Sequence, residues 1–323
     1  MAGVKCIKEL IIALLHYIVS DWLEILFNII FIITVGIFAV IFKGDSWNFQ
    51  AFRAFDYKDN ALGYIHKPSV VTGNMNIFVS FVFAIVASLI GNAFTKIGSK
   101  ETNKKADQQL TVEINMSSKL SSMKEIECLK AESKVRLYRI VWGLIYLIIA
   151  VIETNLITNF TKTSMGVLKP HFLTECKPDQ AIIEALEANG TSWVDEKLTL
   201  TICTNEDTDN RRSFPSGHAS QAGVAVMYSY LEVNDLPKML VASRFLQIVG
   251  VLYAVLICAL RISNNQHHWP DVLVGLTLGA LIALSAFVMK EKQVKRQFRM
   301  SACIKVAVPS EGDAEATNMI PLL

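Results

Sequence analysis

Hydrophobic residues in this chain gather in long runs that hold no charged side chain, or only one or two near their ends. A helix needs about 20 predominantly apolar residues to cross the hydrocarbon core of a bilayer, with about 17 as the lower limit. The runs therefore predict six membrane-spanning helices, at 25–42, 77–94, 137–157, 216–233, 245–260 and 272–289. The stretch 216–233 gives the weakest prediction, because its uncharged part, 219–231, would also suit a buried helix of a soluble protein. Including it, we expect an all-α integral membrane protein with six transmembrane helices in one bundle.

The distribution of Lys and Arg predicts how this bundle is oriented. If the N-terminus is cytosolic, the segments on the cytosolic side hold 20 of the 31 Lys and Arg residues, and the opposite side holds 11. Cytosolic loops of membrane proteins carry the excess of these residues, so we expect both termini in the cytosol. We expect the plasma membrane, with the opposite face extracellular; an endomembrane with a luminal face is the alternative.

The same pattern divides the chain into three parts. Residues 1–21 form a cytosolic or interfacial N-terminal segment, 22–290 form the six-span domain, and 291–323 form a flexible cytosolic tail. The domain includes a polar cytosolic linker at 98–135, between the second and third spans. A short helix is expected within this linker, near 123–134.

Composition narrows the classes of function. The chain is 52% hydrophobic and 19% charged, whereas soluble domains carry about 25% charged residues, so a soluble enzyme is excluded. The net charge of +2 gives no support for nucleic-acid binding. The loop between the third and fourth spans holds a glycosylation sequon at Asn189. It also holds Cys176 and Cys203, which either pair or stay as free thiols.

Residues that suit phosphate chemistry lie at the non-cytosolic ends of the predicted spans, and the first group follows the third span. Lys162 and Lys169 are seven residues apart, close to two helical turns, so they would project from one face of a helix that Pro170 ends. Two parallel ammonium groups suit a dianionic phosphate. Lysines at helix ends also anchor spans, and this pair alone would favour that explanation.

The second group opens the fourth span, where Pro215 and Ser216 precede an apolar run and so predict a helix start. Free backbone N–H groups at a helix N-terminus bind phosphate, and Gly217 lets the backbone approach it closely. His218 adds a side chain that titrates near neutral pH. Ser216 as a simple helix cap would explain the serine but not the histidine.

The third group joins the fifth and sixth spans. Pro270 suits the first turn of the sixth span, which places Asp271 in that turn and His267 just before it. A neighbouring carboxylate can hold one nitrogen of the His267 ring and leave the other nucleophilic. Arg261 adds a planar guanidinium suited to phosphate oxygens. Together the three groups indicate phosphoryl chemistry through a histidine, with no metal site among them.

These groups resemble the three signature motifs of the phosphatidic acid phosphatase type 2 superfamily, and especially its lipid phosphate phosphatase branch. The family pattern is Lys-x6-Arg-Pro, then Pro-Ser-Gly-His, then Ser/Thr-Arg-x5-His-x3-Asp. The chain has Lys162 to Pro170, Pro215 to His218 and Arg261 to Asp271 in the same order. It departs from the pattern at Lys169, where the family has Arg, and at Leu260, where the family has Ser or Thr.

The resemblance implies a metal-independent and cofactor-free phosphatase that hydrolyses membrane lipid phosphates through a phosphohistidine. Phosphatidate, lysophosphatidate and the phosphates of sphingoid bases or ceramide would all fit as substrates. His267 would be the nucleophile, Asp271 would orient it, and His218 would protonate the leaving alcohol. The phosphate would be held by the other residues of the motifs, namely Lys162, Lys169, Ser216, Gly217 and Arg261.

Two alternatives stay open. A phosphotransferase of the same superfamily would pass the phosphoryl group to an alcohol other than water, and a six-span scaffold or transporter would keep the site only as a vestige. The intact set of His218, His267 and Asp271 argues against the scaffold. Gly275 and Gly279 in the sixth span indicate a helix contact, within the bundle rather than between subunits, and leave open whether the protein is a homo-oligomer.

Overall fold

The structure is a computed structural model that describes residues 51–94, 118–205, 207–234 and 240–307, together with six positions between 26 and 37. The predicted N-terminal segment, most of the first predicted span, the first half of the linker and the end of the tail therefore lie outside the described residues.

Contacts divide the chain into two units. The larger unit comprises 32–95 and 143–287, and the smaller one comprises 1–31, 96–142 and 288–323. The predicted site residues all belong to the larger unit.

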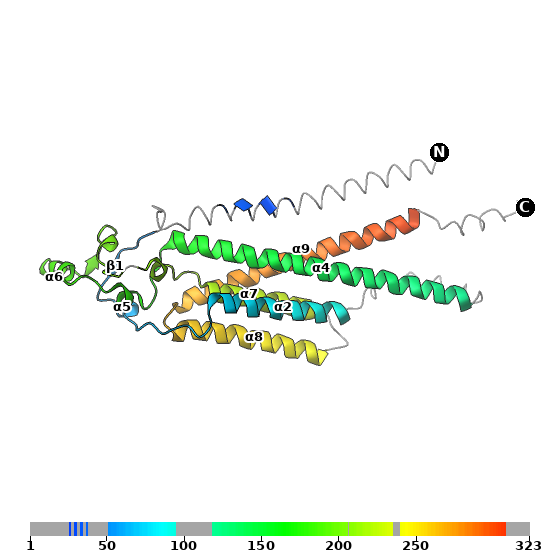
Figure 1. The fold of residues 1–323 in the computed structure, drawn as a ribbon, viewed down its shortest axis with the longest axis horizontal. Coiled ribbons are helices and arrows are strands. Elements are labelled where there is room, and N and C mark those ends of the chain that lie inside the picture. The colour runs from blue at the N-terminus through cyan, green and yellow to red at the C-terminus, as the bar shows by residue number, and fades with distance from the viewer. Residues whose placement is uncertain are drawn as a thin grey trace, which may run out of the picture. The chain divides into compact units, whose positions relative to one another are not determined.

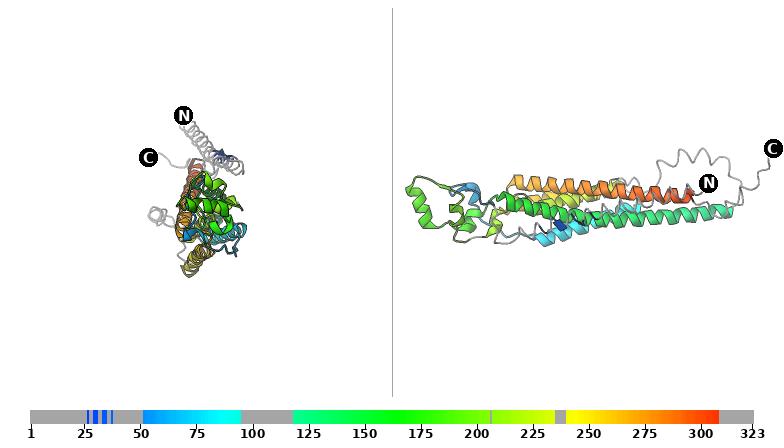
Figure 2. Two further views of the ribbon diagram at one scale, coloured as in Figure 1. Left: turned by 90° about the vertical axis from the view of Figure 1, so that its left-hand side faces the viewer. Right: turned by 90° about the horizontal axis from the view of Figure 1, so that it is seen from above.

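The larger unit is built on helices that alternate in direction. In Figures 1 and 2, α4 and α8 end, and α2, α7 and α9 begin, at the end of the bundle where the small elements α5, α6 and β1 gather. Helix α7 lies between α2 and α8 and packs against both. The long helices are α2 (Gly73–Phe94), α4 (Ser118–Met165), α7 (Gly217–Val233), α8 (Leu240–Ser263) and α9 (Trp269–Ala307).

Four of these helices are long and apolar enough to cross a membrane, through Gly73–Gly91, Leu137–Met165, Val241–Ser263 and Trp269–Arg296. They coincide with four of the six predicted spans, and we treat the chain as a membrane protein. Helix α7 occupies the position of the predicted fourth span. It has only 17 residues, and 11 of them are buried among its neighbours.

Two boundaries differ from the sequence prediction. Helix α4 begins at Ser118, so the second half of the predicted linker is helical and continuous with the span. Helix α9 runs on to Ala307, through residues that were expected to form a flexible tail. Neither 118–142 nor 288–307 contains Gly or Pro, and both are rich in residues with high helix propensity, so nothing stops either helix at the end of its apolar run.

Glycines bring α9 and α7 into close contact. A Cβ atom on Gly275 would collide with the carbonyl oxygen of Ser216, and one on Gly279 would collide with that of Ser220. Gly223 of α7 faces the backbone of α9 at Leu276 in the same way. The predicted helix contact at Gly275 and Gly279 is therefore confirmed within the bundle.

Hydrogen bonds between helices also fix the bundle. Tyr228 of α7 donates its hydroxyl to the carbonyl oxygen of Gly143 in α4 at 2.7 Å. In α8, Tyr253 donates to the side-chain oxygen of Asn76 in α2 at 2.7 Å. Such bonds hold helices together where apolar burial gives little preference between partners.

The site end of the bundle carries a small folded cap, which we define as residues 51–62 and 166–213. Strand β1 pairs antiparallel with β2, with Phe55 opposite Val194. The buried core of the cap consists of Phe55, Leu62, Leu168, Phe172, Cys176, Val194 and Ile202. The cap elements are β1 (Phe55–Asp56), η1 (Asn60–Leu62), α5 (Phe172–Cys176), α6 (Gln180–Ala188), β2 (Trp193–Val194), η2 (Leu198–Leu200) and η3 (Thr208–Arg211).

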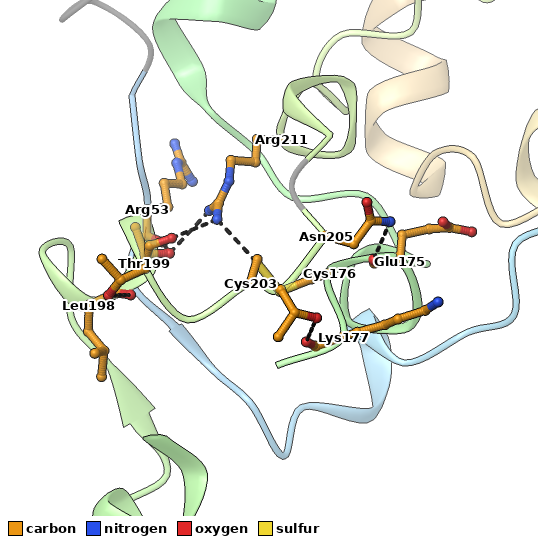
Figure 3. The surroundings of a disulfide bond; sticks show 11 residues. Arg53, Glu175, Cys176, Lys177, Leu198, Thr199, Cys203, Asn205 and Arg211 are labelled. Atoms are coloured by element: carbon orange, nitrogen blue, oxygen red, sulfur yellow. Dashed lines mark hydrogen bonds between the residues drawn. A yellow bond between two sulfur atoms is a disulfide. The ribbon is translucent and has the colours of Figure 1, made fainter. Parts of the chain in front are cut away.

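A disulfide and a buried arginine hold the cap together (Figure 3). Cys176 is joined to Cys203. The guanidinium of Arg211 is fully buried and donates to the carbonyl oxygen of Thr199 at 2.7 Å and to its hydroxyl at 3.1 Å. The Cζ atom of the Arg211 guanidinium also lies 4.8 Å from the centre of the Phe172 ring, within the range of a cation–π contact. These contacts fix the chain just before the second motif.

Candidate active site

The second and third motifs meet at the N-termini of α7 and α9. Ser216 is the N-cap of α7, and Asp271 lies in the first turn of α9, as the sequence predicts. The backbone N–H of Ser216 donates to the carbonyl oxygen of Asp271 at 2.9 Å, which joins the two helix starts directly. The first turn of α7 therefore offers N–H groups to an anion beside the third motif.

Lys162 lies in the last turn of α4 and reaches this helix start. Its Cε atom would be 4.0 Å from a Cβ atom on Gly217, so the two residues face one another across a narrow space. Gly217 therefore brings the α7 backbone close to the Lys162 side chain.

Lys169 reaches the site from a loop, not from the helix that the sequence predicts. Helix α4 ends at Met165, because Gly166 adopts a positive φ of 57° and packs its Cα against the backbone of Ala51. The loop is held by the backbone N–H of Lys169, which donates to the carbonyl oxygen of Asn210 at 2.9 Å. The expectation of one continuous helix from Lys162 to Pro170 is therefore wrong.

The ammonium of Lys169 is buried and paired with the carboxylate of Asp209 in η3. Desolvation acts to raise the pKa of Asp209, but the charges of Lys169, Lys162 and Arg212 together hold it below its usual range. Asp209 is therefore a carboxylate at neutral pH, and it forms an ion pair with the Lys169 ammonium.

His267 is held by a backbone carbonyl. Its Nδ1 atom lies 2.8 Å from the carbonyl oxygen of Ser213, and because a carbonyl only accepts, Nδ1 carries the hydrogen. Nε2 then holds the lone pair, and among the described residues it has no hydrogen-bond partner. Burial, together with the charges of Lys162, Arg261 and Lys169, keeps the pKa of His267 well below 6.5, so the ring is neutral.

Asp271 acts on this histidine through Ser213. Its Oδ2 atom is 3.9 Å from Nδ1 of His267, too far for a hydrogen bond, whereas the hydroxyl of Ser213 donates to it. Oδ2 also accepts the backbone N–H of His268 at 3.0 Å. The sequence led us to expect a direct hydrogen bond from the His267 ring to Asp271. The structure differs, because Ser213 bonds to both residues, through its hydroxyl to Asp271 and through its carbonyl oxygen to His267.

Arg261, at the end of α8, is buried and only partly satisfied. Its Nη1 atom donates to the hydroxyl of Ser69 at 2.7 Å, and its Nη2 atom donates to the side-chain oxygen of Gln266 at 3.3 Å. Its Nε atom is buried and has no partner among the described residues. An unsatisfied buried donor of a guanidinium fits a site that is completed by an anionic oxygen.

His218, in the first turn of α7, is held from the segment before α2. Its Nε2 atom lies 3.2 Å from the carbonyl oxygen of Val71, so Nε2 carries a hydrogen. Its own carbonyl oxygen accepts from Asn76 at 3.1 Å. Nδ1 is thus the nitrogen that can exchange a proton with a ligand.

Sequence analysis missed four residues of this arrangement. Ser213, Ser69 and Val71 position His267, Arg261 and His218, and serines and backbone carbonyls give no signal in a single sequence. Arg212 donates to the hydroxyl of Thr163 at 2.8 Å, one residue from Lys162, and its buried Nε atom has no partner among the described residues. This further cation could have been found by counting charges next to the second motif.

The two remaining predicted residue sets lie in the cap. Asn189 is exposed at the C-terminal end of α6, at the same end of the bundle as the three motifs. Cys176 and Cys203 form the disulfide described above.

The structure thus brings all three motifs to one end of a membrane-embedded helical bundle. A neutral histidine with a free lone pair lies among buried cations and beside the N-terminus of a helix. This combination defines a class of membrane protein with a buried cationic site suited to a phosphate group.

Comparison with known proteins gives one family match. Residues 142–295, which include all three motifs, match the family described as the PAP2 superfamily. This match covers just under half of the chain, and the relatives below, named as phospholipid and diacylglycerol pyrophosphate phosphatases, are what the chain is similar to. No solved structure matches the chain significantly.

Three relatives illustrate the likeness. Phospholipid phosphatase 1 of Rattus norvegicus is 32% identical over 133 residues, which cover 40% of this chain and 45% of the relative. Diacylglycerol pyrophosphate phosphatase 1 of Saccharomyces cerevisiae is 31% identical over 146 residues, covering 44% and 49%. Phospholipid phosphatase 2 of Rattus norvegicus is 33% identical over 130 residues, covering 39% and 45%. The chain thus spans about half the length of the curated relatives it matches.

Proposed function

We propose that this protein hydrolyses phosphomonoesters of membrane lipids through a phosphohistidine on His267. The observation that carries the proposal is the state of this ring. Its Nδ1–H is held by the Ser213 carbonyl, and its Nε2 lone pair is left free in a buried place surrounded by cations. A neutral imidazole with a fixed tautomer is ready to attack without first losing a proton.

The substrate phosphate is bound by charges from three parts of the chain. Lys162 and Lys169 come from the end of α4 and the following loop, and Arg261 comes from the end of α8. The N–H of Gly217, in the first turn of α7, contributes the partial positive charge of a helix N-terminus, whereas the N–H of Ser216 is donated to Asp271. These donors stabilise the negative charge that grows on the phosphoryl oxygens in the transition state.

In the first step, Nε2 of His267 attacks phosphorus while the bond from phosphorus to the ester oxygen breaks. Binding of the phosphate dianion favours the protonated form of His218. The departing alkoxide then takes a proton from Nδ1 of His218, whose Nε2–H remains on the Val71 carbonyl. The products are the free lipid alcohol and a phosphohistidine.

In the second step, neutral His218 takes a proton from a water molecule as that water attacks phosphorus. The P–N bond breaks, Nε2 of His267 recovers its lone pair, and inorganic phosphate leaves. His218 is then protonated again, ready for the next turnover.

Substrate class and setting follow from the bundle and its relatives. The site lies at the ends of helices that are long and apolar enough to cross a membrane, so it meets headgroups at the bilayer surface. We propose phosphatidate, lysophosphatidate and sphingoid-base or ceramide phosphates as substrates, at the non-cytosolic face. The cations at Lys162, Lys169 and Arg261 take the place of a metal ion, so no metal is required.

The test is phosphate release from each of these lipids in mixed micelles, with excess EDTA and with His267→Ala as the control. Release by the wild type alone is the expected result. Loss of activity on chelation that magnesium restores would contradict the metal-free mechanism. Turnover only with an added alcohol acceptor would indicate a phosphotransferase, and no release from any lipid phosphate would indicate a vestigial site.

A further inference from the structure

One segment beside the site is not part of any motif. It runs over residues 64–71, between η1 and α2, and we name it the strap. Its inner side holds the site: Ser69 accepts from Arg261 and donates to the carbonyl oxygen of Val71 at 2.6 Å. The same carbonyl oxygen accepts from His218. The strap is therefore connected by hydrogen bonds to two of the three motifs.

The strap is also fixed to the turn that joins α8 to α9. Asn265 donates to the carbonyl oxygen of Ile65 at 2.9 Å, and Gln266 donates to that of Lys67 at 3.3 Å. In return, the ammonium of Lys67 donates to the carbonyl oxygen of Ser263 at 3.3 Å. Three hydrogen bonds thus hold the strap at the level of this turn.

The turn marks one edge of the membrane. It lies between Ser263, where one membrane-crossing helix ends, and Trp269, where the next begins. Exposed Trp side chains at span ends are typical of the membrane–water interface, and Trp269 is 67% exposed. Because the strap is fixed to this turn, it lies at the bilayer surface.

The strap exposes two aliphatic side chains beside its polar ones. Ile65 is 73% exposed and Val70 is 75% exposed, whereas Leu200, an exposed apolar residue in η2 of the cap, is 51% exposed. Exposed apolar side chains beside a functional site are candidates for contact with a membrane or a partner. Ile262, near the end of α8, is also exposed.

We propose that the strap is a membrane-contact element, and that Ile65 and Val70 insert among the acyl chains of bilayer lipids at the non-cytosolic surface. Insertion places the phosphate site at the depth of the headgroups, so that a lipid phosphate reaches Arg261 and His218 without leaving the leaflet. This inference rests on the proposed function, since it concerns how a lipid substrate meets the same site.

The test compares two substrates with the protein reconstituted in phosphatidylcholine vesicles. One is a long-chain phosphatidate within the bilayer, and the other is dibutyryl phosphatidate, which is soluble in water. In the double variant Ile65→Ser, Val70→Ser, we expect kcat/KM to fall about tenfold for the long-chain substrate, because two apolar anchors are lost. For the soluble substrate, kcat/KM should stay within about twofold, which also shows that the variant is folded.

Two control variants test whether the effect is specific to apolar side chains of the strap. Leu200→Ser removes an exposed apolar side chain from the cap and should leave kcat/KM for both substrates unchanged. Ile65→Leu with Val70→Leu keeps an apolar strap and should restore turnover of the long-chain substrate.

Other outcomes would overturn the inference. An equal fall for both substrates would mean that the side chains only support the site, and no change for either would mean that the strap does not touch the bilayer. A loss that depends on protein density in the vesicle would show that a second copy of the chain covers the strap. If the wild type released phosphate from neither substrate, the proposed function itself would fail.

Discussion

At the scale of single residues, the site depends on how each charged or nucleophilic group is held. His267 is oriented by a carbonyl oxygen of Ser213, and Asp271 contacts the hydroxyl of the same serine. The carboxylate thus fixes the residue that fixes the histidine. Ser213 is a positioning residue, and its effect can be separated from that of the nucleophile.

Ser213→Ala keeps the carbonyl that orients His267 but removes the hydroxyl bonded to Asp271. A hydrogen bond to a charged group contributes about 1.5–3 kcal/mol, so we expect phosphoenzyme formation to slow by roughly 10- to 100-fold without being abolished. Rapid-quench measurement of a single turnover checks this. If Ser213 and Asp271 act as a unit, the double variant Ser213→Ala, Asp271→Asn should form the phosphoenzyme little more slowly than Asp271→Asn alone. If the two losses in rate, expressed as free energies, add up fully, the residues act separately.

Lys169 departs from the family pattern and gives a second prediction at this scale. Lys169→Arg should retain or increase kcat/KM, because a guanidinium can keep the pair with Asp209 and also offer two parallel donors to phosphate. Lys169→Ala should lower kcat/KM by roughly 10- to 100-fold, since it leaves the Asp209 carboxylate uncompensated beside the substrate.

Steady-state phosphate release measures both changes at Lys169. Lys177→Ala, at an exposed lysine beyond α5, serves as the control and should have no effect. If Lys169→Arg were as damaging as Lys169→Ala, the site would have been rebuilt around the shorter cation, and the family geometry would not apply there.

At the scale of helices and loops, the site depends on how closely α7 and α9 approach. Gly275 and Gly279 allow the backbone of α9 to touch that of α7, and the hydrogen bond from Ser216 to Asp271 is formed at the end of this contact. The two motifs are therefore held in register by the packing of small residues. A side chain introduced there would separate them.

Gly279→Ala tests this packing. The added Cβ would meet the Ser220 carbonyl, and overpacking of this kind costs about 1–3 kcal/mol. We expect a lower thermal midpoint and a loss of kcat/KM, because the start of α7 moves away from Asp271. Gly63→Ala is the matched control, since the nearest atom to its Cβ would be 3.9 Å away. Equal behaviour of the two variants would argue against the close contact.

The sequence predicted where helices begin better than where α4 ends. Apolar runs and helix caps are local signals, so the starts of α7 and α9 at Ser216 and Trp269 follow from the chain itself. The end of α4 does not, because Gly166 leaves the helix to pack against Ala51, which is far away in sequence. The strap was missed for the same reason, since its role depends on contacts with α7 and α8.

At the scale of the whole chain, topology decides which compartment the site faces. The motifs and the cap lie at the same end of the larger unit, so the location of Asn189 reports the location of the site. The bias of Lys and Arg towards the opposite segments predicts a non-cytosolic site. The sequence predicts this orientation from a statistical preference of charged loops and not from a contact within the fold.

Asn189 should therefore carry a glycan when the protein is made in eukaryotic cells. A glycosidase-sensitive mass shift that Asn189→Gln abolishes is the expected result, since the side chain is exposed at the end of α6. The predicted cytosolic linker holds another sequon at Asn115. A glycan on Asn115 in place of Asn189 would invert the orientation and put the site in the cytosol.

In the proposed mechanism His267 becomes phosphorylated during turnover. Rapid acid-free denaturation of the protein after mixing with ³²P-labelled phosphatidate should trap an acid-labile, alkali-stable phosphoenzyme. His267→Ala should abolish it, whereas His268→Ala should still form it, because His268 is one residue out of register with Arg261 and Asp271. A phosphoenzyme that survives His267→Ala, or full turnover by that variant, would contradict the account.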